Sequence, residues 1–348
     1  MKKFIDRITN WEQWPFWMRY LNITPMWALY CIRSGTPWFF TPSNPTLSFG
    51  GFEGESKREM YEQLPPNSFP HTIYIEPGIP FAEVRARSEA GGFSFPFIVK
   101  PDVGMAGILF RKINSWPELE AYHMQMPVDY LVQALIPYEI EYSIFYYRYP
   151  GQQRGTITGF LQKEPMSVTG DGRRTLRALM EAHPKAKYRL DEMFAKHEAT
   201  LEEVLPAGEK RFLTYAANLN RGGHFINLHD AIDDRLLAVV DRLNLYSKEF
   251  YYGRYDLKAA SLEDLKAGRN FLLLEYNGSG AEPNHVYNCG MSLRAAHREI
   301  LRHWKALYEI SAQNRRRGIK PWPLRKGWRF LKGAGRHFRQ LKELDEQL

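Results

Sequence analysis

The stretch FLLLEYNGSGAEPNH, residues 271–285, is an apolar run that ends at a carboxylate, Glu275, and two places later at an amide, Asn277. Because residues two apart in a β-strand face the same side, we expect these two side chains to project together. The preceding strand pattern, YYGRYDLKA, ends near Asp256 and is joined to this run by the polar connector 259–270. The short connector favours an antiparallel pair, which would bring Asp256 beside the other two side chains.

Three oxygen donors on adjacent strands suit Mg²⁺, which takes oxygen ligands and leaves positions open for phosphates. A phosphate-binding element is also present. Lys100 follows the apolar strand 97–99 and precedes a loop that contains Gly104 and Gly107. An ammonium at this place can contact one phosphate while backbone amides of the loop cover the others. The sequence therefore predicts a nucleotide site at which Lys100 and the three oxygen donors converge.

Strand and helix patterns mix along the chain without repeats or regular βαβ units, which indicates an α+β fold. Residues 185–210 are polar, helical in pattern and typical of an insertion, and a helix is expected to start near Thr175. The first 50 residues hold five of the nine tryptophans and predict an irregular region that packs on a core or meets a partner. The other expected elements are strands at 72–75, 97–99, 108–110, 130–135 and 140–148, and helices at 56–64, 116–124, 231–249 and 291–312.

Seven segments carry a resemblance to a known superfamily. In chain order they are SKREMYEQL, PFIVKPDVGMAGILF, YLVQALIPYEIEYSI, VTGDGRRTL, NLNRGGHFINL, GRYDLKA and LLLEYNG. Together, over about residues 55–312, they resemble ATP-grasp enzymes, closest to the D-alanine–D-alanine ligase and cyanophycin synthetase branch of carboxylate–amine ligases. The resemblance implies two α+β lobes that grip ATP between them. The implied division is an aromatic-rich N-terminal region at 1–54, a small lobe at 55–136, a large lobe at 137–312 and a basic amphipathic tail at 313–348.

The resemblance also implies nucleotide-binding roles for residues of the small lobe and its border. Lys57 and Lys100 would bind phosphates, and Gly104 to Gly107 would lie in the loop that closes over ATP. Glu141 would hold the ribose hydroxyls. A hinge between the lobes would contact adenine through its backbone; its residues are Gln133, Ala134, Leu135 and Ile136.

The large lobe would supply the metal ligands and the remaining catalytic groups. Arg254 would face the tetrahedral intermediate, and Arg221, with Asn220, would lie near the transferred phosphoryl group. Two Mg²⁺ ions, with Glu275 as the bridging ligand, would be bound by Asp256, Glu275 and Asn277.

The implied reaction has two steps: a carboxylate attacks the γ-phosphorus of ATP to give an acylphosphate and ADP, and an amine then displaces phosphate. Small-molecule carboxylates and amines are therefore the expected substrates. Two alternatives stay open, an ATP-grasp phosphotransferase that stops at a phosphorylated product and a non-catalytic nucleotide-binding scaffold at a membrane. The chain departs from the family at Ala134, where an acidic residue is common, and in the short N-terminal region, so neither the acid nor the amine is identified.

Simpler interpretations stand beside these roles. Glu275 and Asn277 could be the polar end of a strand, and Lys100 could be a solvated lysine at a strand end. His224 and His285 lie beside glycine turns, where histidines are usually only hydrogen-bonded, so no role is assigned to them.

The net charge of +8 has an uneven distribution. Residues 315–348 hold 11 Lys and Arg against 3 Asp and Glu, which equals the net charge of the whole chain. A basic pI therefore describes the tail, and nucleic-acid binding is not expected from it. Three partners remain open for the tail at 315–342: the protein's own body, an anionic membrane surface, or nucleic acid.

The composition and the apolar segments indicate in which cellular compartment the protein is expected. The chain has 44% hydrophobic and 25% charged residues, as expected for a folded domain, and its two cysteines, Cys31 and Cys289, do not form a disulfide framework. No compact apolar segment follows the first three residues, and no run reaches the about 20 apolar residues of a membrane span. We therefore expect a cytoplasmic protein, with the inner membrane surface as the alternative for the tail. The oligomeric state does not follow from the sequence.

Overall fold

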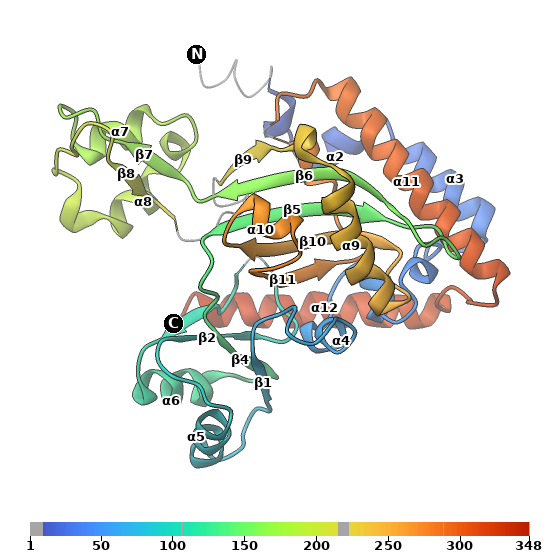
Figure 1. The fold of residues 1–348 in the computed structure, drawn as a ribbon, viewed down its shortest axis with the longest axis horizontal. Helices are drawn as coiled ribbons and strands as arrows, with labels where there is room; N and C mark the ends of the chain where they lie inside the picture. Colours follow the sequence, from blue (N-terminus) through green and yellow to red (C-terminus); the bar gives the residue numbers. More distant parts are fainter. Residues whose placement is uncertain (1–9, 106, 215–222, 288, 348) are drawn as a thin grey trace. The chain divides into compact units, whose positions relative to one another are not determined.

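Figure 1 shows the computed structural model, which describes residues 10–105, 107–214, 223–287 and 289–347. The chain forms two compact units, the first comprising Met1–Leu161 and Leu228–Leu348 and the second Gln162–Asn227. The first unit contains sheets with helices packed on them, so the predicted α+β class is confirmed. The boundaries predicted after residues 54, 136 and 312 all lie inside this first unit.

The smaller sheet of the first unit has the order β1-β4-β2-β3, with antiparallel neighbours throughout. Its strands are β1 (Thr72–Ile75), β2 (Phe97–Pro101), β3 (Arg111–Ile113) and β4 (Tyr130–Ala134), and its helices are α5 (Phe81–Ala90) and α6 (Trp116–Gln125). Phe97 and Val99 are buried in the core that also includes Val84 of α5 and Leu119 of α6. Since side chains alternate along a strand, Lys100 points to the face away from this core.

The strand expected at 108–110 is wrong. Residues 107–109 form a turn, and β3 begins at Arg111. Gly107 has a φ of 75° and Leu109 a φ of 54°, both in the left-handed region, which interrupts an extended strand.

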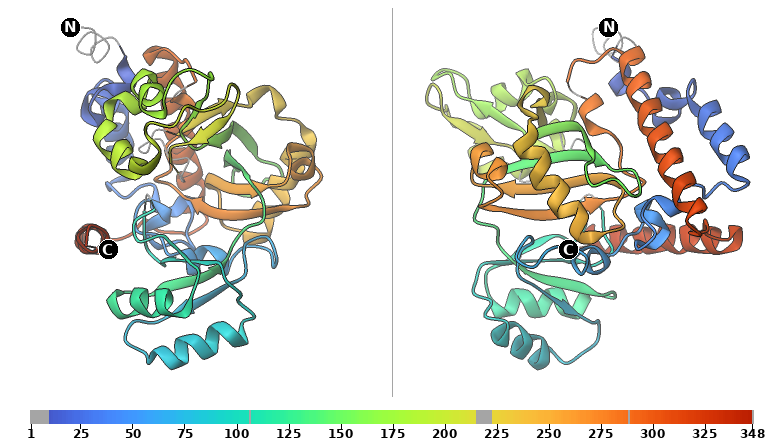
Figure 2. Two further views of the ribbon diagram at one scale, coloured as in Figure 1. Left: turned by 90° about the vertical axis from the view of Figure 1, so that its left-hand side faces the viewer. Right: turned by 45° about the vertical axis from the view of Figure 1, so that its right-hand side comes forward.

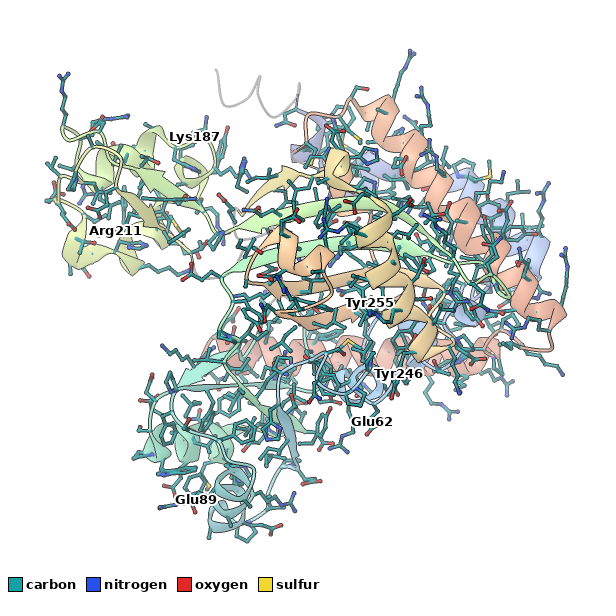
Figure 3. The ribbon with its side chains drawn as sticks, in the orientation of Figure 1. Glu62, Glu89, Lys187, Arg211, Tyr246 and Tyr255 are labelled. Atoms are coloured by element: carbon teal, nitrogen blue, oxygen red, sulfur yellow. The ribbon has the colours of Figure 1, made fainter. Side chains whose placement is uncertain are left out.

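In the larger sheet, β11, β10, β5 and β6 are consecutive neighbours. The elements are β5 (Ile140–Tyr147), β6 (Thr156–Glu164), β10 (Tyr252–Ala259), β11 (Phe271–Asn277), α9 (Asp234–Ser247) and α10 (Leu262–Lys266). Leu236, Val240 and Leu243 give α9 an apolar face, which packs with Tyr255 and Tyr276 in one core. Figure 3 labels Tyr255 of this core. Because this core covers one face of the sheet, the residues at alternate positions face the other side.

The N-terminal region packs against α11 (Leu293–Arg316) rather than remaining irregular. It contains α2 (Phe16–Tyr20) and α3 (Thr24–Ser34), and Figure 2 shows α3 beside α11. The stacked rings of Tyr30 and Tyr308 have centroids 4.5 Å apart. Packing on the protein's own core was one of the two predicted roles for this region, whereas the expectation of an irregular segment is wrong for α3.

The basic tail forms α12 (Leu324–Asp345), which packs on other parts of the first unit. Leu341 is fully buried in the core of the smaller sheet, and the Oδ1 of Asp345 accepts a hydrogen bond from the backbone N–H of Leu109. Trp328, in contrast, remains 53% exposed. Within the part of the chain that the structure describes, no helix is both long and apolar enough to cross a membrane.

The second unit, Gln162–Asn227, has a core of its own. Its elements are β7 (Ser167–Thr169), α7 (Leu176–Ala182), α8 (Leu190–Lys196), β8 (Lys210–Phe212) and β9 (His224–Asn227). The hydroxyl of Thr175 accepts a hydrogen bond from the backbone N–H of Ala178 and caps α7, which confirms the predicted helix start. The predicted insertion at 185–210 is therefore part of a larger folded unit.

Candidate active site

The polar residues in the first part of β10 and at the end of β11 share one face of the larger sheet. The two strands are antiparallel, as predicted, and their register opposes Arg254 to Asn277 and Asp256 to Glu275. Because alternate residues of a strand face the same side, these four side chains project together. Tyr255, which lies between Arg254 and Asp256, is fully buried on the opposite face.

A β-bulge interrupts the strand pairing directly beside these four polar residues. The register changes between Asp256 and Leu257, so that Leu257 pairs with Leu273 and Leu274 is an extra residue on β11. The carbonyl of Leu274 accepts a hydrogen bond of 2.7 Å from the hydroxyl of Tyr61. Tyr61 belongs to α4 (Lys57–Tyr61), so the bulge joins the end of β11 to the helix that carries Lys57.

Asp256 is buried among hydrogen-bond donors. Its Oδ1 accepts a hydrogen bond of 2.7 Å from the hydroxyl of Ser143. Its Oδ2 accepts one of 3.0 Å from Nη2 of Arg254 and one of 3.3 Å from Nδ2 of Asn277. Burial opposes the charge of Arg254, but the neighbouring carboxylate of Asp256 raises the pKa of the guanidinium above its ordinary value. The guanidinium of Arg254 therefore stays charged beside Asp256.

The three predicted metal ligands fit a divalent cation by chemistry and by placement. Asp256 and Glu275 face each other across the strand pair, and Asn277 contacts Asp256. A half-turn of the Asn277 amide exchanges its NH₂ for its oxygen, which is the atom a hard cation prefers. Binding at Asp256 must also compete with Arg254, because the guanidinium and the cation would neutralise the same carboxylate.

Of the two predicted phosphate-binding lysines, Lys57 is buried and Lys100 is half-buried, and both interact electrostatically with Glu275. Burial lowers the pKa of Lys100 to about 8, although the charge of Glu275 opposes the shift. The pKa of Lys57 is also lowered, by burial and by the positive charge of Lys100, and Glu275 again acts in the opposite direction. Two partly desolvated ammonium groups near one carboxylate favour the binding of an additional anion.

The glycine loop between β2 and β3 contacts Lys57. The ammonium of Lys57 donates to the carbonyl of Asp102 at 3.2 Å and to that of Gly104 at 3.3 Å. Gly107, with its φ of 75°, lies in the left-handed turn of this loop. The loop and the start of α4 are thus held together on the side of the smaller sheet that carries Lys100.

Two acidic residues of this site were not predicted. The carboxylate of Asp102 accepts hydrogen bonds from the hydroxyl of Ser56 and the backbone N–H of Arg58, and so fixes the first turn of α4. Burial raises the pKa of Glu55 to about 7, and the charge of Glu275 adds to the shift. The nearness of both acids to Lys57 and Lys100 in sequence was the available signal, but no spacing rule distinguishes such acids from surface residues.

The four residues of the predicted hinge, 133–136, differ in burial and in hydrogen bonding. Gln133 is fully buried in β4, and its Nε2 donates to the hydroxyls of Thr72 and Tyr61. Its Oε1 has no hydrogen-bond partner among the described residues. The backbone N–H of Ala134 already donates to the carbonyl of His71, whereas Leu135 is exposed and Ile136 is half-buried.

The remaining predicted site residues are Glu141, Arg221 and Asn220. Glu141 is on β5 opposite Lys258, on the same face of the strand as Ser143. Arg221 and Asn220 lie outside the described residues, so their predicted place near a phosphoryl group stays a prediction.

Comparisons with known proteins add distant structural similarity. No family model and no curated protein matches the sequence. A bifunctional glutathione synthetase from Pasteurella multocida is similar over 74% of this chain and 38% of its own, with 13% identity and a TM-score of 0.44. VanG D-Ala:D-Ser ligase from Enterococcus faecalis covers 69% of this chain and 57% of its own at 14% identity and a TM-score of 0.37. D-alanine–D-alanine ligase from Bacillus anthracis is similar over 73% of this chain and 68% of its own, with 13% identity and a TM-score of 0.39.

This chain therefore spans little more than a third of the length of the glutathione synthetase. Because all three TM-scores are below 0.5, these similarities by themselves assign neither a family nor an activity to the chain.

Proposed function

We propose that this protein is an ATP-dependent ligase of the ATP-grasp type, which joins a carboxylate to an amine through an acylphosphate. One observation carries the proposal: Glu275 is electrostatically coupled to Lys57 and Lys100 and opposes Asp256 across the strand pair. A cluster of two partly desolvated ammonium groups and hard oxygen donors has the composition that a metal–polyphosphate complex requires. The superfamily itself is part of this proposal and follows from the seven sequence segments.

Lys57 and Lys100 would contact phosphate oxygens from the smaller sheet. The folded chain disfavours the charged form of both lysines through burial. A bound phosphate would reverse this effect, because an anion nearby stabilises an ammonium. The lysines would therefore be most firmly charged when the nucleotide is in place.

Asp256, Glu275 and Asn277 would hold Mg²⁺ from the larger sheet. When bound, Mg-ATP supplies the activating phosphoryl group, and its metal offsets the charge on the phosphate oxygens. Arg254 is already oriented by Asp256, and its Nη1 donates to the carbonyl of Glu282. Its remaining N–H groups are suited to stabilising an oxyanion on the reacting carboxyl carbon.

A screen of amino acids and dipeptides for stimulated ADP release tests the proposal. We expect ADP release to depend on a carboxylate and an amine together, with a new amide product detected by mass spectrometry. ADP release with a phosphorylated product and no amide, whichever amine is supplied, would support the phosphotransferase instead. Stabilisation by Mg-ATP without any turnover would support the scaffold, because a ligand that binds only the native state raises its stability.

The location and the membrane contact of the tail belong to the same proposal. We propose a cytoplasmic enzyme with a peripheral contact through α12. Six basic side chains of this helix are exposed: Arg325, Lys326, Arg329, Lys332, Arg336 and Arg339. Leu341 holds the helix on the protein's own body, so the basic side chains and Trp328 would make the contact with anionic lipid.

A further inference from the structure

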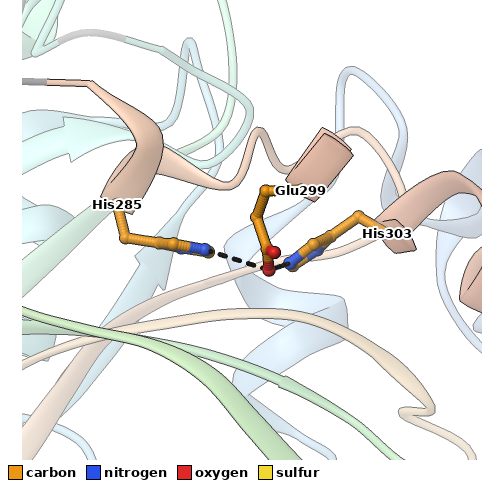
Figure 4. Close-up of side chains that lie close together, drawn as sticks. All are labelled: His285, Glu299 and His303. Atoms are coloured by element: carbon orange, nitrogen blue, oxygen red, sulfur yellow. Dashed lines mark hydrogen bonds and ion pairs between the residues drawn. The ribbon is translucent and has the colours of Figure 1, made fainter. Parts of the chain in front are cut away.

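A second polar cluster, outside the proposed nucleotide site, lies between η8 (Asn284–Val286) and α11. Figure 4 shows its members, His285 from η8 with Glu299 and His303 from α11. The ring of His303 packs edge-on against Phe145 of β5, with centroids 4.4 Å apart. His285 lies against Gly159 of β6, where an added Cβ would come within 2.1 Å of its Nδ1. A glycine at this position is therefore required for the histidine to fit.

The potential ligand atoms have the spacing of a metal coordination sphere. The Oε1 of Glu299 lies 3.5 Å from Nε2 of His285 and 3.3 Å from Nε2 of His303. One ligand atom from each of the three residues can be chosen so that all lie within 4.8 Å of one another. Bonds of about 2.1 Å to a tetrahedral ion separate its ligand atoms by about 3.4 Å. These two N–O distances therefore match two edges of such a tetrahedron.

Neighbouring atoms hold Glu299 and His303 in ligand orientations. Nη1 of Arg302 contacts the second oxygen of Glu299, Oε2, at 3.0 Å and leaves Oε1 directed at the histidines. The hydroxyl of Tyr252 lies 3.4 Å from Nδ1 of His303. An outer partner on the second ring nitrogen is the usual arrangement of a histidine whose first nitrogen binds a metal.

Hydrogen bonding among these residues does not account for all of their buried atoms. His303 is 0% exposed and His285 is 5% exposed. Nε2 of His303 and Nδ1 of His285 have no hydrogen-bond partner among the residues that the structure describes. Although Nε2 of His303 is only 3.3 Å from Glu299, the alignment does not make a hydrogen bond. An unpaired buried nitrogen is costly, and a cation bound at Nε2 of His303 would remove that cost at this atom.

We propose that His285, Glu299 and His303 form a binding site for a divalent transition-metal ion of the Zn²⁺ class. Two imidazoles and one carboxylate select such an ion over Mg²⁺, which takes oxygen ligands. The three side chains leave a fourth tetrahedral position for water or another ligand. The site is separate from the oxygen-donor site of Asp256 and does not depend on the proposed ligase activity.

Bound metal would fix the segment that follows β11. Asn284, next to His285, donates from Nδ2 to the hydroxyl of Ser143, and this hydroxyl donates to Asp256. A metal that ties η8 to α11 would hold Asn284 in this chain of hydrogen bonds. The transition metal is thus a positioning element for the neighbouring site rather than a reactant.

The test uses the full chain without a histidine tag, stripped of metal by a chelator and titrated with Co²⁺. Co²⁺ reports its coordination through visible absorption bands, and Zn²⁺ should displace it. We expect one equivalent to bind with the intensity of a four-coordinate site, and an excess of Mg²⁺ to leave the bands unchanged. Absence of these bands in the wild type would overturn the proposal.

Variants locate the ion. His285→Asn and Glu299→Gln should each weaken Co²⁺ binding at least tenfold, whereas the control His297→Asn on the same helix should not. His297 contacts the carbonyl of Arg19 and lies outside the cluster. Thermal melts of metal-free protein identify any variant that fails to fold, and the other variant then decides. Equal Co²⁺ affinity in the folded ligand variants and the control would contradict the site.

Discussion

Two polar clusters contact neighbouring residues on one side of β5, and the chain assembles them in different ways. Ser143 contacts Asp256 in the oxygen-donor cluster, and Phe145, two residues on, contacts His303 in the histidine cluster. The first cluster draws Asp256 and Glu275 from one strand pair with a short connector. The second joins residues of η8 and α11 that no strand register relates. The comparison teaches that a strand pair displays its chemistry in the sequence, whereas a site between a turn and a helix does not.

The largest expected effect tests the oxygen-donor cluster. Glu275→Gln removes the carboxylate that is coupled to both lysines and should lower ATP turnover on the order of 1,000-fold while the fold survives. Steady-state ADP release and circular dichroism measure the two quantities. The control is Glu263→Gln, an exposed carboxylate of α10 paired with Arg235. Near-normal ATP turnover in the Glu275 variant would remove this residue from the proposed chemistry.

Lys100→Met should separate ligand binding from folding. Lys100 has a pKa of about 8 in the folded chain against an ordinary value of 10.5. The unfolded state therefore binds more protons between these values, so wild-type stability rises as the pH increases across this window. Replacing this partly desolvated ammonium should raise the free energy of unfolding at pH 7 by up to about 3 kcal/mol and remove this rise. The same variant should lose its stabilisation by Mg-ATP.

Urea unfolding at about pH 7 and about pH 9.5, with and without Mg-ATP, measures the effects of this substitution. Lys112→Met on the neighbouring strand β3 is the control, because Lys112 is exposed. A Lys100 variant that keeps the full stabilisation by Mg-ATP would show that this lysine does not contact the nucleotide.

The substitution Ser143→Ala tests whether ligand binding at the oxygen-donor cluster and at the histidine cluster is coupled. The hydroxyl of Ser143 donates to Asp256 and accepts from Asn284, the neighbour of His285. Loss of these hydrogen bonds should weaken the binding of Mg-ATP by about 1 kcal/mol and that of Co²⁺ by less. Isothermal titration of each ligand in the presence of the other measures both values. Co²⁺ affinity identical to that of the wild type would mean that the clusters act independently.

The smallest expected effect concerns the tail, which belongs to neither cluster. Arg329→Glu and Arg336→Glu reverse charges on the exposed face of α12 and leave the buried Leu341 in place. Each should weaken binding to vesicles that contain anionic lipid by about 1 kcal/mol or more at low salt, without changing ATP turnover. Co-sedimentation measures the binding. If the wild type itself does not sediment with anionic vesicles, the tail serves only the protein's own packing.

Elements with a strong local pattern were predicted well. The antiparallel pair β10–β11, the strand 72–75, the helix 116–124 and the cap at Thr175 follow from alternation, turn residues and capping chemistry within a few residues. The strand expected at 108–110 failed because two left-handed residues interrupt an apolar run. Strand β6 was missed because its alternation of apolar and polar residues is weak.

The sequence by itself determined that Asp256, Glu275 and Asn277 share one face, since alternation and a short connector leave little freedom. It also determined the lysine near the end of strand β2 and the glycine loop that follows this strand. Only the tertiary structure decided that Glu55 and Asp102 join this site, that α12 packs on the body through Leu341, and that His285 meets Glu299 and His303. The physical reason is the separation of the residues along the chain. Periodicity specifies neighbours within one element or one hairpin, whereas contacts between distant segments depend on how the cores pack.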